Sequence, residues 1–357
     1  MYSHAVFKEK FDHELLKYIL VREKLFKEKL KPFPNDYEAI WEYTKKLVSS
    51  GKRLRPYVCY LSYDACGGKK FSDIVGILVS LELLHLSFLV HDDIMDEGKV
   101  RHGVATAHEY FAKNISRNIQ KNKKQFGISR GLLLGDFLFY WSADIFDKSS
   151  RVFSVERRDK ARNYYLDMVG ETMLGQAIDI ELTIKKTASE KDIYIKNYFK
   201  TANYTFIRPL QIGATLAGKD GHLKKFFESF GTSSGIAFQM QDDLLDILGT
   251  KKSLNKDLFT DLREGQHTIF TQYIFDKGTK EEKKLLRYFW KKKDIKARQH
   301  KTIQNLFIRS GAISYGTGLI EHYIRHAYEK IKAFSGNTKV KMKNFQSLLD
   351  LITKRVS

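Results

Sequence analysis

GILVSLELLHLSFLVHDDIMD, residues 76–96, is the most informative stretch of this 357-residue chain. Fifteen almost entirely apolar residues lead directly into the acidic pattern DDIMD (residues 92–96). The apolar part contains Glu82 and His85 and is shorter than the ~20 residues that span a bilayer, so it predicts a buried helix. On such a helix the first and last aspartates of the pattern lie one turn apart on the same face.

A second copy of the pattern, DDLLD at residues 242–246, follows another largely apolar run, GIAFQMQ. Two unpaired acidic clusters at the ends of apolar helices would repel each other and resist burial. Hard cations between them relieve this cost, and Mg²⁺ prefers carboxylate oxygens together with substrate phosphates. The pair of motifs therefore predicts two opposed aspartate rows that handle a diphosphate through a metal cluster.

The composition favours an all-α fold. Only four prolines occur, and 43% of the residues are hydrophobic, which allows long helices around a sizeable core. No linker composition divides the chain, so residues 1–357 are expected to form a single domain. The two cysteines (Cys59 and Cys66) suit neither a disulfide framework nor a zinc site, and the N-terminus lacks signal-peptide features. A cytoplasmic protein is the expectation.

The net charge of +20 predicts attraction to polyanions. Much of the excess lies in residues 277–301, which carry eleven Lys or Arg. A solvated helix face is the favoured interpretation, and peripheral contact with a membrane surface stays open. No nucleic-acid motif is present, so nucleic acid is not expected as a partner.

Helical periodicity recurs along the chain. The expected helices cover residues 7–30, 36–48, 131–146, 159–181, 193–217 and 223–248. Residues 116–130 read as an exposed connection, and residues 249–266 read as a loop.

Candidate phosphate-binding cations gather near the acidic motifs. GKRLRP supplies Lys52, Arg53 and Arg55 on a turn, and guanidinium groups bind phosphate in a bidentate manner. Further candidates are Arg101, Lys200 and Lys256.

Seven motifs in order carry a family resemblance between residues 51 and 268. They are GKRLRP, HLSFLVHDDIMD, RHG, GQAID, KTANYTF, GIAFQMQDDLLD and NKDLFTDLREGQHT. This series resembles the trans-isoprenyl diphosphate synthases, which include farnesyl, geranylgeranyl and polyprenyl diphosphate synthases. The resemblance implies a class I isoprenoid synthase fold, that is, antiparallel helices around a deep apolar cavity with the acidic motifs at its mouth. It also implies a homodimer.

The resemblance assigns roles to individual residues. About three Mg²⁺ ions are expected, with Asp92, Asp96 and Asp242 as direct ligands. Asp93, Asp243 and Asp246 are expected to act through waters and hydrogen bonds. The remaining assignments concern the two substrates. The allylic diphosphate is expected at Arg101, Lys200 and Lys256, near Gln176 and Asp179; isopentenyl diphosphate is expected at Lys52, Arg55, His85 and His102.

The expected reaction begins with ionisation of the allylic diphosphate beside magnesium and fixed cations. Carbonyl groups around Lys200 and Thr201 and the Gln239 oxygen are expected to stabilise the carbocation that isopentenyl diphosphate attacks. Three positions depart from the family pattern: His102 replaces an arginine, Gln266 a lysine and Asn255 a glycine. The first two replacements each remove a charge, which favours an altered substrate preference or low activity.

Product length is expected to depend on Ser87 and Phe88, five and four residues before Asp92. Short-chain enzymes of the animal farnesyl type carry aromatic residues at both positions, whereas this chain keeps one. The expected product is geranylgeranyl diphosphate, with farnesyl or longer polyprenyl products as alternatives.

Three other functions stay open at this point: a class I terpene cyclase, prenyl transfer to a non-prenyl acceptor, and a non-catalytic subunit that regulates a synthase. GKRLRP and the second aspartate motif argue against a cyclase. The intact aspartates argue against a non-catalytic subunit.

Overall fold

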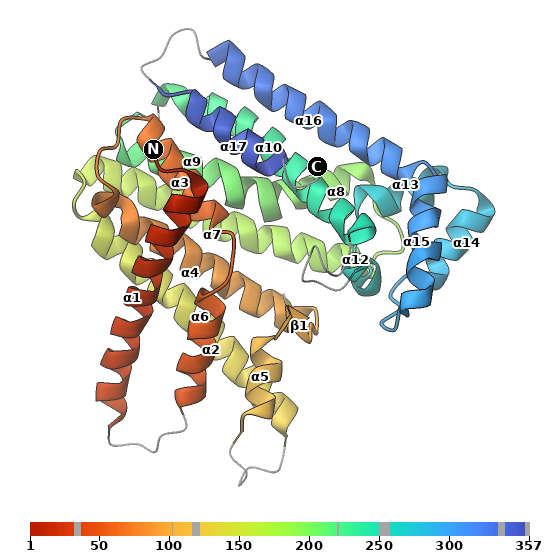
Figure 1. The fold of residues 1–357 in the computed structure, drawn as a ribbon, viewed down its shortest axis with the longest axis horizontal. Coiled ribbons are helices and arrows are strands. Elements are labelled where there is room, and N and C mark those ends of the chain that lie inside the picture. Colours follow the sequence, from red (N-terminus) through yellow and green to blue (C-terminus); the bar gives the residue numbers. More distant parts are fainter. Residues whose placement is uncertain are drawn as a thin grey trace. The chain divides into compact units, whose positions relative to one another are not determined.

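A computed structural model describes residues 1–31, 37–101, 103–115, 122–219, 221–249, 258–334 and 340–353, the side chain of His222 excepted (Figure 1). Almost all of these residues are helical, which confirms the all-α prediction. Internal contacts divide the chain into two compact units. Unit 1 comprises Met1–Tyr60 and Lys69–Arg158, and unit 2 comprises Leu61–Gly68 and Asp159–Ser357. The single-domain prediction stays a prediction.

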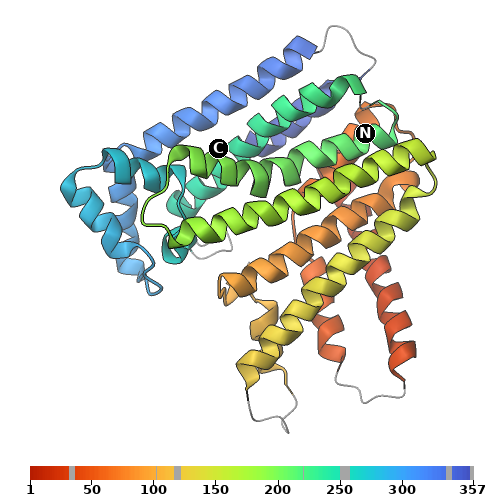
Figure 2. The same cartoon turned by 180° about the vertical axis from the view of Figure 1, so that it is seen from behind.

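Unit 1 is built around a helix that is buried on every side. Its elements are α1 (His4–Leu30), α2 (Glu38–Val48), α4 (Phe71–Met95), β1 (Val100–Arg101), β2 (Val104–Ala105), α5 (Ala107–Lys113) and α6 (Lys123–Ser150), while α3 (Leu54–Ala65) contributes to both units. Residues 77–84 of α4 are all buried, as expected for a helix that is apolar all round. Figure 2 shows α4 (orange) and α6 (yellow) running side by side.

Small side chains let α4 and α6 approach closely. A Cβ added to Gly76 would lie 1.9 Å from Ser149 Oγ, so only glycine fits at that position. Farther along the contact, Ser142 Oγ donates to the Ser80 carbonyl oxygen over 2.7 Å. This hydrogen bond satisfies a buried hydroxyl that would otherwise be costly.

Helix α4 is longer than its apolar core suggested. It spans 25 residues and is, among the residues that the structure describes, the one helix long and apolar enough to cross a membrane. Of its most apolar stretch, 67% is buried inside the fold, as is typical of a core helix.

The segment after α4 contains the two strands of unit 1. Strands β1 and β2 form a two-stranded antiparallel hairpin in which Val100 pairs with Ala105 and Arg101 with Val104. Two-residue strands are too short to show alternation in the sequence, so periodicity could not reveal them.

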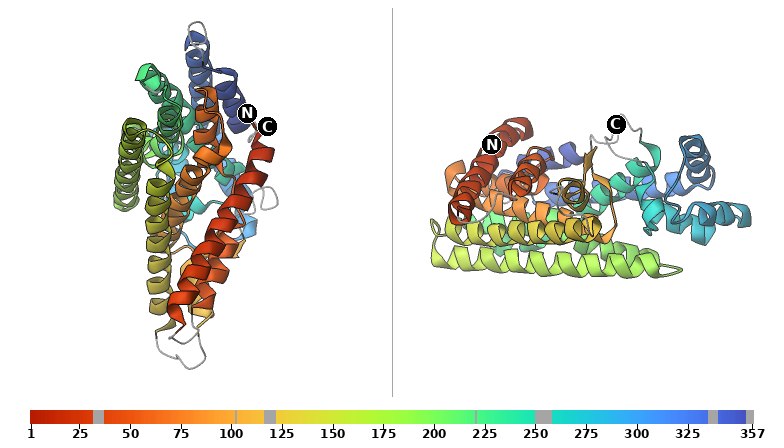
Figure 3. Two further views of the ribbon diagram at one scale, coloured as in Figure 1. Left: turned by 90° about the vertical axis from the view of Figure 1, so that its left-hand side faces the viewer. Right: turned by 90° about the horizontal axis from the view of Figure 1, so that it is seen from below.

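Unit 2 is organised around α10, which packs against η1 and α16. Its helices are α7 (Val155–Ile184), α8 (Glu190–Asn197), the π-helix η1 (Tyr198–Ile207), α9 (Arg208–Leu216), the 3₁₀ turn η2 (Gly221–Leu223), α10 (Lys224–Leu248), α12 (Thr260–Glu264), α13 (Ile269–Lys277), α14 (Lys280–Phe289), α15 (Ala297–Arg309), α16 (Ala312–Phe334) and α17 (Lys343–Thr353). Helices α13, α14 and α15 lie together (blue in Figure 3). Phe270 and Phe307 belong to a cluster of buried apolar side chains that these helices share.

Two sequence expectations need correction. Residues 116–130 were expected to be an exposed connection, but α6 already begins at Lys123. The expected loop at residues 249–266 contains α12, whose five residues are too few to show helical periodicity.

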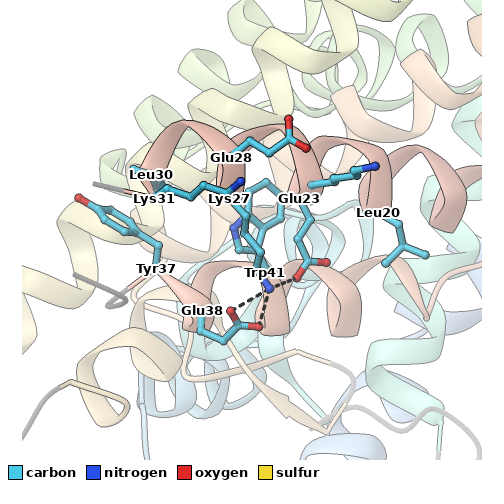
Figure 4. Close-up of a pocket in the computed structure, with 10 residues that line it drawn as sticks. Leu20, Glu23, Lys27, Glu28, Leu30, Lys31, Tyr37, Glu38 and Trp41 are labelled. Atoms are coloured by element: carbon cyan, nitrogen blue, oxygen red, sulfur yellow. Dashed lines mark hydrogen bonds and ion pairs between the residues drawn. The ribbon is translucent and has the colours of Figure 1, made fainter. Parts of the chain in front are cut away.

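A pocket of about 890 Å³ opens between α1 and α2 in unit 1 (Figure 4). Trp41 and Leu20 form part of its lining, and Lys27 bridges Glu23 and Glu38 over 2.9 and 3.0 Å at its edge. None of its lining residues belongs to the motifs that carry the predicted chemistry.

Candidate active site

The first aspartate motif closes helix α4. Asp92 and Asp93 lie in its last turn, and Asp96 is its C-terminal cap. Asp93 is buried, with 7% exposure, whereas Asp92 and Asp96 are only partly buried. The two carboxylates predicted as direct metal ligands are therefore the more accessible ones of the motif.

Arg101 binds this motif from the hairpin. Its guanidinium donates from Nε to Asp93 Oδ1 over 2.7 Å and from Nη2 to Asp92 Oδ2 over 3.2 Å. The hairpin begins close to the motif, because the Gly98 amide donates to the Asp93 carbonyl oxygen over 2.9 Å. A cation that bridges neighbouring carboxylates offsets their mutual repulsion.

The protonation of the motif follows from this arrangement. Burial raises the pKa of Asp93 to about 6, although Arg101 opposes the rise. Burial alone would lower the pKa of Arg101, but Asp93 and Asp92 outweigh it and the net shift is upward. Arg101 therefore keeps its charge beside the aspartates.

Arg53 of GKRLRP points into the core of unit 1. It donates to Asp12 Oδ1 over 2.6 Å and to Glu82 Oε1 over 2.7 Å, and its side chain is fully buried. The expectation that Arg53 faces a phosphate is therefore wrong. In the same motif Lys52 is exposed and Arg55 is partly buried, and their assignment to isopentenyl diphosphate stays a prediction.

The two predicted chain-length residues lie on different faces of α4. Phe88 is partly buried and lies one turn before Asp92 on the same face, and His85, also partly buried, lies two turns before Asp92 on that face. Ser87 is fully buried and lies two turns after Ser80, whose carbonyl oxygen accepts from Ser142 of α6. Its hydroxyl finds no hydrogen-bond partner in the described part of the chain. The role of both residues in chain length stays a prediction.

The second aspartate motif ends α10 in unit 2. Asp243 is buried with 5% exposure, and Asp242 is partly buried. Gln239 donates from Nε2 to Asp243 Oδ1 over 2.8 Å, and its Oε1 accepts from Thr201 Oγ1 over 2.7 Å. Burial raises the pKa of Asp243 to about 7, opposed by Lys196 and Gln239. The structure thus joins Thr201 and Gln239, both predicted site residues, to the motif.

Asp246, the last residue of the motif, organises α12. Its Oδ1 accepts from the Thr260 amide over 3.0 Å and its Oδ2 from the Asp261 amide over 3.1 Å. These amides belong to the first turn of a helix, where N–H groups lack intrahelical partners. Metal contact by Asp246 stays a prediction.

A cluster of charges lies beside η1. Asp179 of GQAID is buried with 3% exposure, and its Oδ2 accepts from Lys200 Nζ over 2.5 Å. Its Oδ1 lies 3.3 Å from Nζ of Lys196, a residue that the sequence interpretation missed. Gln266 Nε2 donates to Asp179 Oδ2 over 3.4 Å. Burial would raise the pKa of Asp179, but Lys196 and Lys200 lower it overall, so this carboxylate is ionised.

Glycines on two flanking helices position the π-helix. A Cβ added to Gly175 of α7 would lie 2.5 Å from the Lys200 backbone nitrogen. One added to Gly235 of α10 would lie 2.4 Å from Ala202 Cα. Only glycine allows such close approach, so the glycine of GQAID serves to seat Lys200 and Thr201. The π-helix is rare in proteins, and where it does occur it is often at a functional site.

Three predictions for this site are not tested further. His102 and Lys256, both predicted phosphate ligands, lie outside the described residues, as does Asn255. The place of Gln176 near the allylic substrate stays a prediction. Gln176 belongs to GQAID, the motif that also supplies Asp179 of the charge cluster described above.

Oxygen ligands for magnesium are present in both motifs. Among the residues that the structure describes, no three His, Cys, Asp or Glu side chains form a ready-made metal cluster. Mg²⁺ is usually bound by one or two carboxylates, waters and substrate phosphates rather than by an all-protein cage. The accessible pair Asp92 and Asp96, and Asp242 in the second motif, fit that requirement.

Comparisons with known proteins agree with these motifs. The family model for polyprenyl synthetase matches residues 37–307. A geranylgeranyl pyrophosphate synthase from Geoglobus acetivorans is 30% identical over 87% of this chain and 90% of that protein. A geranylgeranyl diphosphate synthase from Sulfolobus acidocaldarius is 27% identical over 90% of this chain and 91% of that protein.

The fold is also found among solved structures. A geranylgeranyl pyrophosphate synthase from Corynebacterium glutamicum, in complex with isoprenyl diphosphate and magnesium, superimposes with a TM-score of 0.89. The superposition covers 98% of both chains at 24% sequence identity, and it shows a shared fold.

Proposed function

The chain belongs to the polyprenyl synthetase family and is a prenyltransferase, and on that premise we propose that it makes geranylgeranyl diphosphate as its main product. Its substrates are isopentenyl diphosphate and an allylic diphosphate (dimethylallyl, geranyl or farnesyl). The proposal is supported by the two relatives described above, which match most of the chain and are both geranylgeranyl diphosphate synthases.

One observation carries the proposed chemistry. Each aspartate motif ends a long, largely buried helix. Arg101 lies beside Asp92 of the first motif, Lys196 opposes the rise that burial causes in the pKa of Asp243 in the second, and Lys200 pairs with Asp179. Paired acidic and basic groups of this kind suit a ligand that is itself a metal–diphosphate complex.

Magnesium has a defined place in this proposal. Asp92 and Asp96 hold two of about three ions, and Asp242 holds the third. When bound, the ions neutralise the negative charge that develops on the departing diphosphate.

The protein's own side chains position the substrate. Arg101, Lys200 and Lys256 bind the allylic diphosphate, and Lys52, Arg55, His85 and His102 bind isopentenyl diphosphate. The guanidinium of Arg101 exchanges its present contacts with Asp92 and Asp93 for phosphate oxygens when the allylic diphosphate binds, because it forms strong charge-assisted hydrogen bonds with phosphate. Gln239 faces the reacting carbons with an amide that Thr201 and Asp243 hold in orientation.

A homodimer is the proposed assembly. Helix α7 carries Leu166, Met173 and Ile180 at seven-residue spacing, with exposures of 52%, 50% and 43%. Residues seven apart share a helix face, and exposed apolar stripes mark interaction sites. A second copy of this chain is the occupant that we propose, and sedimentation velocity of the purified protein tests it: a dimer supports the proposal, and a monomer at micromolar concentration contradicts it.

The activity is tested with purified protein, Mg²⁺, labelled isopentenyl diphosphate and each allylic diphosphate in turn. We expect a twenty-carbon product, and loss of product on chelation of the metal or in Asp92→Asn. An Asp147→Asn variant, whose side chain is 54% exposed near the C-terminal end of α6, serves as the matched control. Absence of any elongated product would contradict the proposal, and a hydrocarbon formed from farnesyl diphosphate alone would identify a cyclase instead.

A further inference from the structure

We propose that Lys196 is a further positioning residue for prenyl transfer. From α8 it gives Asp179 a second cationic partner, so that the attraction of this carboxylate is shared and Lys200 stays available to bind the diphosphate. This inference rests on the proposed function and deepens it.

The two lysines bind opposite oxygens of one carboxylate. Lys196 Nζ lies 3.3 Å from Asp179 Oδ1, and Lys200 Nζ lies 2.5 Å from Oδ2. Besides this ion pair, Lys196 Nζ donates a hydrogen bond to the His267 carbonyl oxygen over 2.9 Å, which fixes the ammonium group. Asp179 is thus held between two cations, and Lys196 is the one that is anchored on both sides.

Burial separates the roles of the two lysines. The Lys196 side chain is 9% exposed and that of Asp179 is 5% exposed, whereas that of Lys200 is 29% exposed. Desolvation of an ammonium group is expensive, so a buried lysine is retained only with good partners. Lys200 is the member that reaches solvent and can meet an incoming anion.

The charge balance shows why a second lysine matters. Asp179 and Lys200 alone would form a neutral pair with little attraction for a diphosphate. Lys196 makes the group of three carry a net charge of +1, and it divides the attraction of the Asp179 carboxylate between two ammonium groups. Lys200 therefore remains available to phosphate oxygens while its position is still fixed.

Replacement and rescue test the inference. Lys196→Met removes the charge and keeps most of the apolar length, and we expect the KM for the allylic diphosphate to rise about 10- to 100-fold, as for loss of a charge-assisted contact. The KM for isopentenyl diphosphate is expected to stay within about twofold of the wild-type value. Calorimetric titration with inorganic pyrophosphate and Mg²⁺ is expected to show a parallel loss of affinity. Lys191→Met, an exposed position on the same helix, is the matched control.

Gln266 offers a site for rescue, because its Nε2 already lies 3.4 Å from Asp179 Oδ2. In Lys196→Met/Gln266→Lys the second cation returns from another element, and we expect at least half of the lost pyrophosphate binding to return. Thermal unfolding by circular dichroism shows which variants are folded, and Lys196→Gln replaces Lys196→Met if the latter unfolds.

Either of two outcomes overturns the inference. One is a folded Lys196 variant that behaves like Lys191→Met in both assays. The other is a folded double variant that recovers no pyrophosphate affinity, because that result assigns Lys196 to packing. If the wild-type protein elongates no allylic diphosphate, the proposed function fails, and the pyrophosphate titration still decides the role of Lys196.

Discussion

Replacing Gly175 by alanine tests whether the close packing of α7 against the π-helix η1 controls catalysis. The added Cβ would lie 2.5 Å from Lys200 N, 2.8 Å from Lys200 Cα and 2.9 Å from Phe199 C. All three are backbone atoms, so no side-chain rotation relieves the clash. Ordinary carbon contacts are about 3.5–4.0 Å, so η1 must move by roughly 1 Å. Overpacking of this kind costs about 1–3 kcal/mol of folding free energy.

The activity should fall by more than the stability suggests. Lys200 and Thr201 move with the backbone, and a misplacement of about 1 Å can cost roughly 100-fold in rate. The assay is kcat for incorporation of labelled isopentenyl diphosphate, together with the midpoint of thermal unfolding. Gly170→Ala is the matched control, because it lies on the same helix and an added Cβ there meets nothing within 4 Å. If Gly175→Ala is as active and as stable as Gly170→Ala, close packing at Gly175 does not position Lys200 and Thr201.

Three further changes have defined outcomes. Phe88→Ala should lengthen the products beyond twenty carbons, because the ring shares the face of Asp92, and an unchanged product distribution by chromatography would contradict this. Arg53→Met should lower the free energy of unfolding by about 3–5 kcal/mol, because it leaves Glu82 buried without its partner; urea denaturation measures this, and a loss below about 1 kcal/mol would count against it. Burial lowers the pKa of His108, so the unfolded chain takes up a proton that the folded protein does not. This contribution to stability is present above the unfolded-state pKa of about 6.5 and is lost as the pH falls below it. Between pH 7.5 and 5.5 the melting temperature of the metal-free His108→Gln protein should therefore change more favourably, by falling less or rising more, than that of the wild type; equal slopes for the two proteins would refute the assignment.

The sequence predicted the parts of the fold that depend on local pattern. A long apolar run that ends in DDIMD is sufficient to predict α4, because a helix buried on all sides needs no amphipathic signal. The long helices α7 and α10 are predicted by a different signal, their helical periodicity. Short elements such as the hairpin around Arg101 and the helix α12 escaped, since two to five residues carry no measurable period.

Long-range partners within the site were beyond the sequence. Lys196 stands four residues before Lys200, which places the two on one helix face, but nothing in the sequence shows that Asp179 lies between them. Arg53 was grouped with Lys52 because both belong to GKRLRP, yet its backbone φ of +53° turns it toward Asp12. Such orientations depend on tertiary contacts rather than on motif membership.

The contact between Asp246 and α12 gives the protein an internal reporter. The Asp246 carboxylate accepts hydrogen bonds from the backbone amides of Thr260 and Asp261. These two amide hydrogens are therefore shielded from exchange with solvent while the hydrogen bonds last. An ion that drew this carboxylate away would leave both amides open. Deuterium uptake at two positions in α12 would then record the occupancy of the aspartate motif without any measurement of turnover.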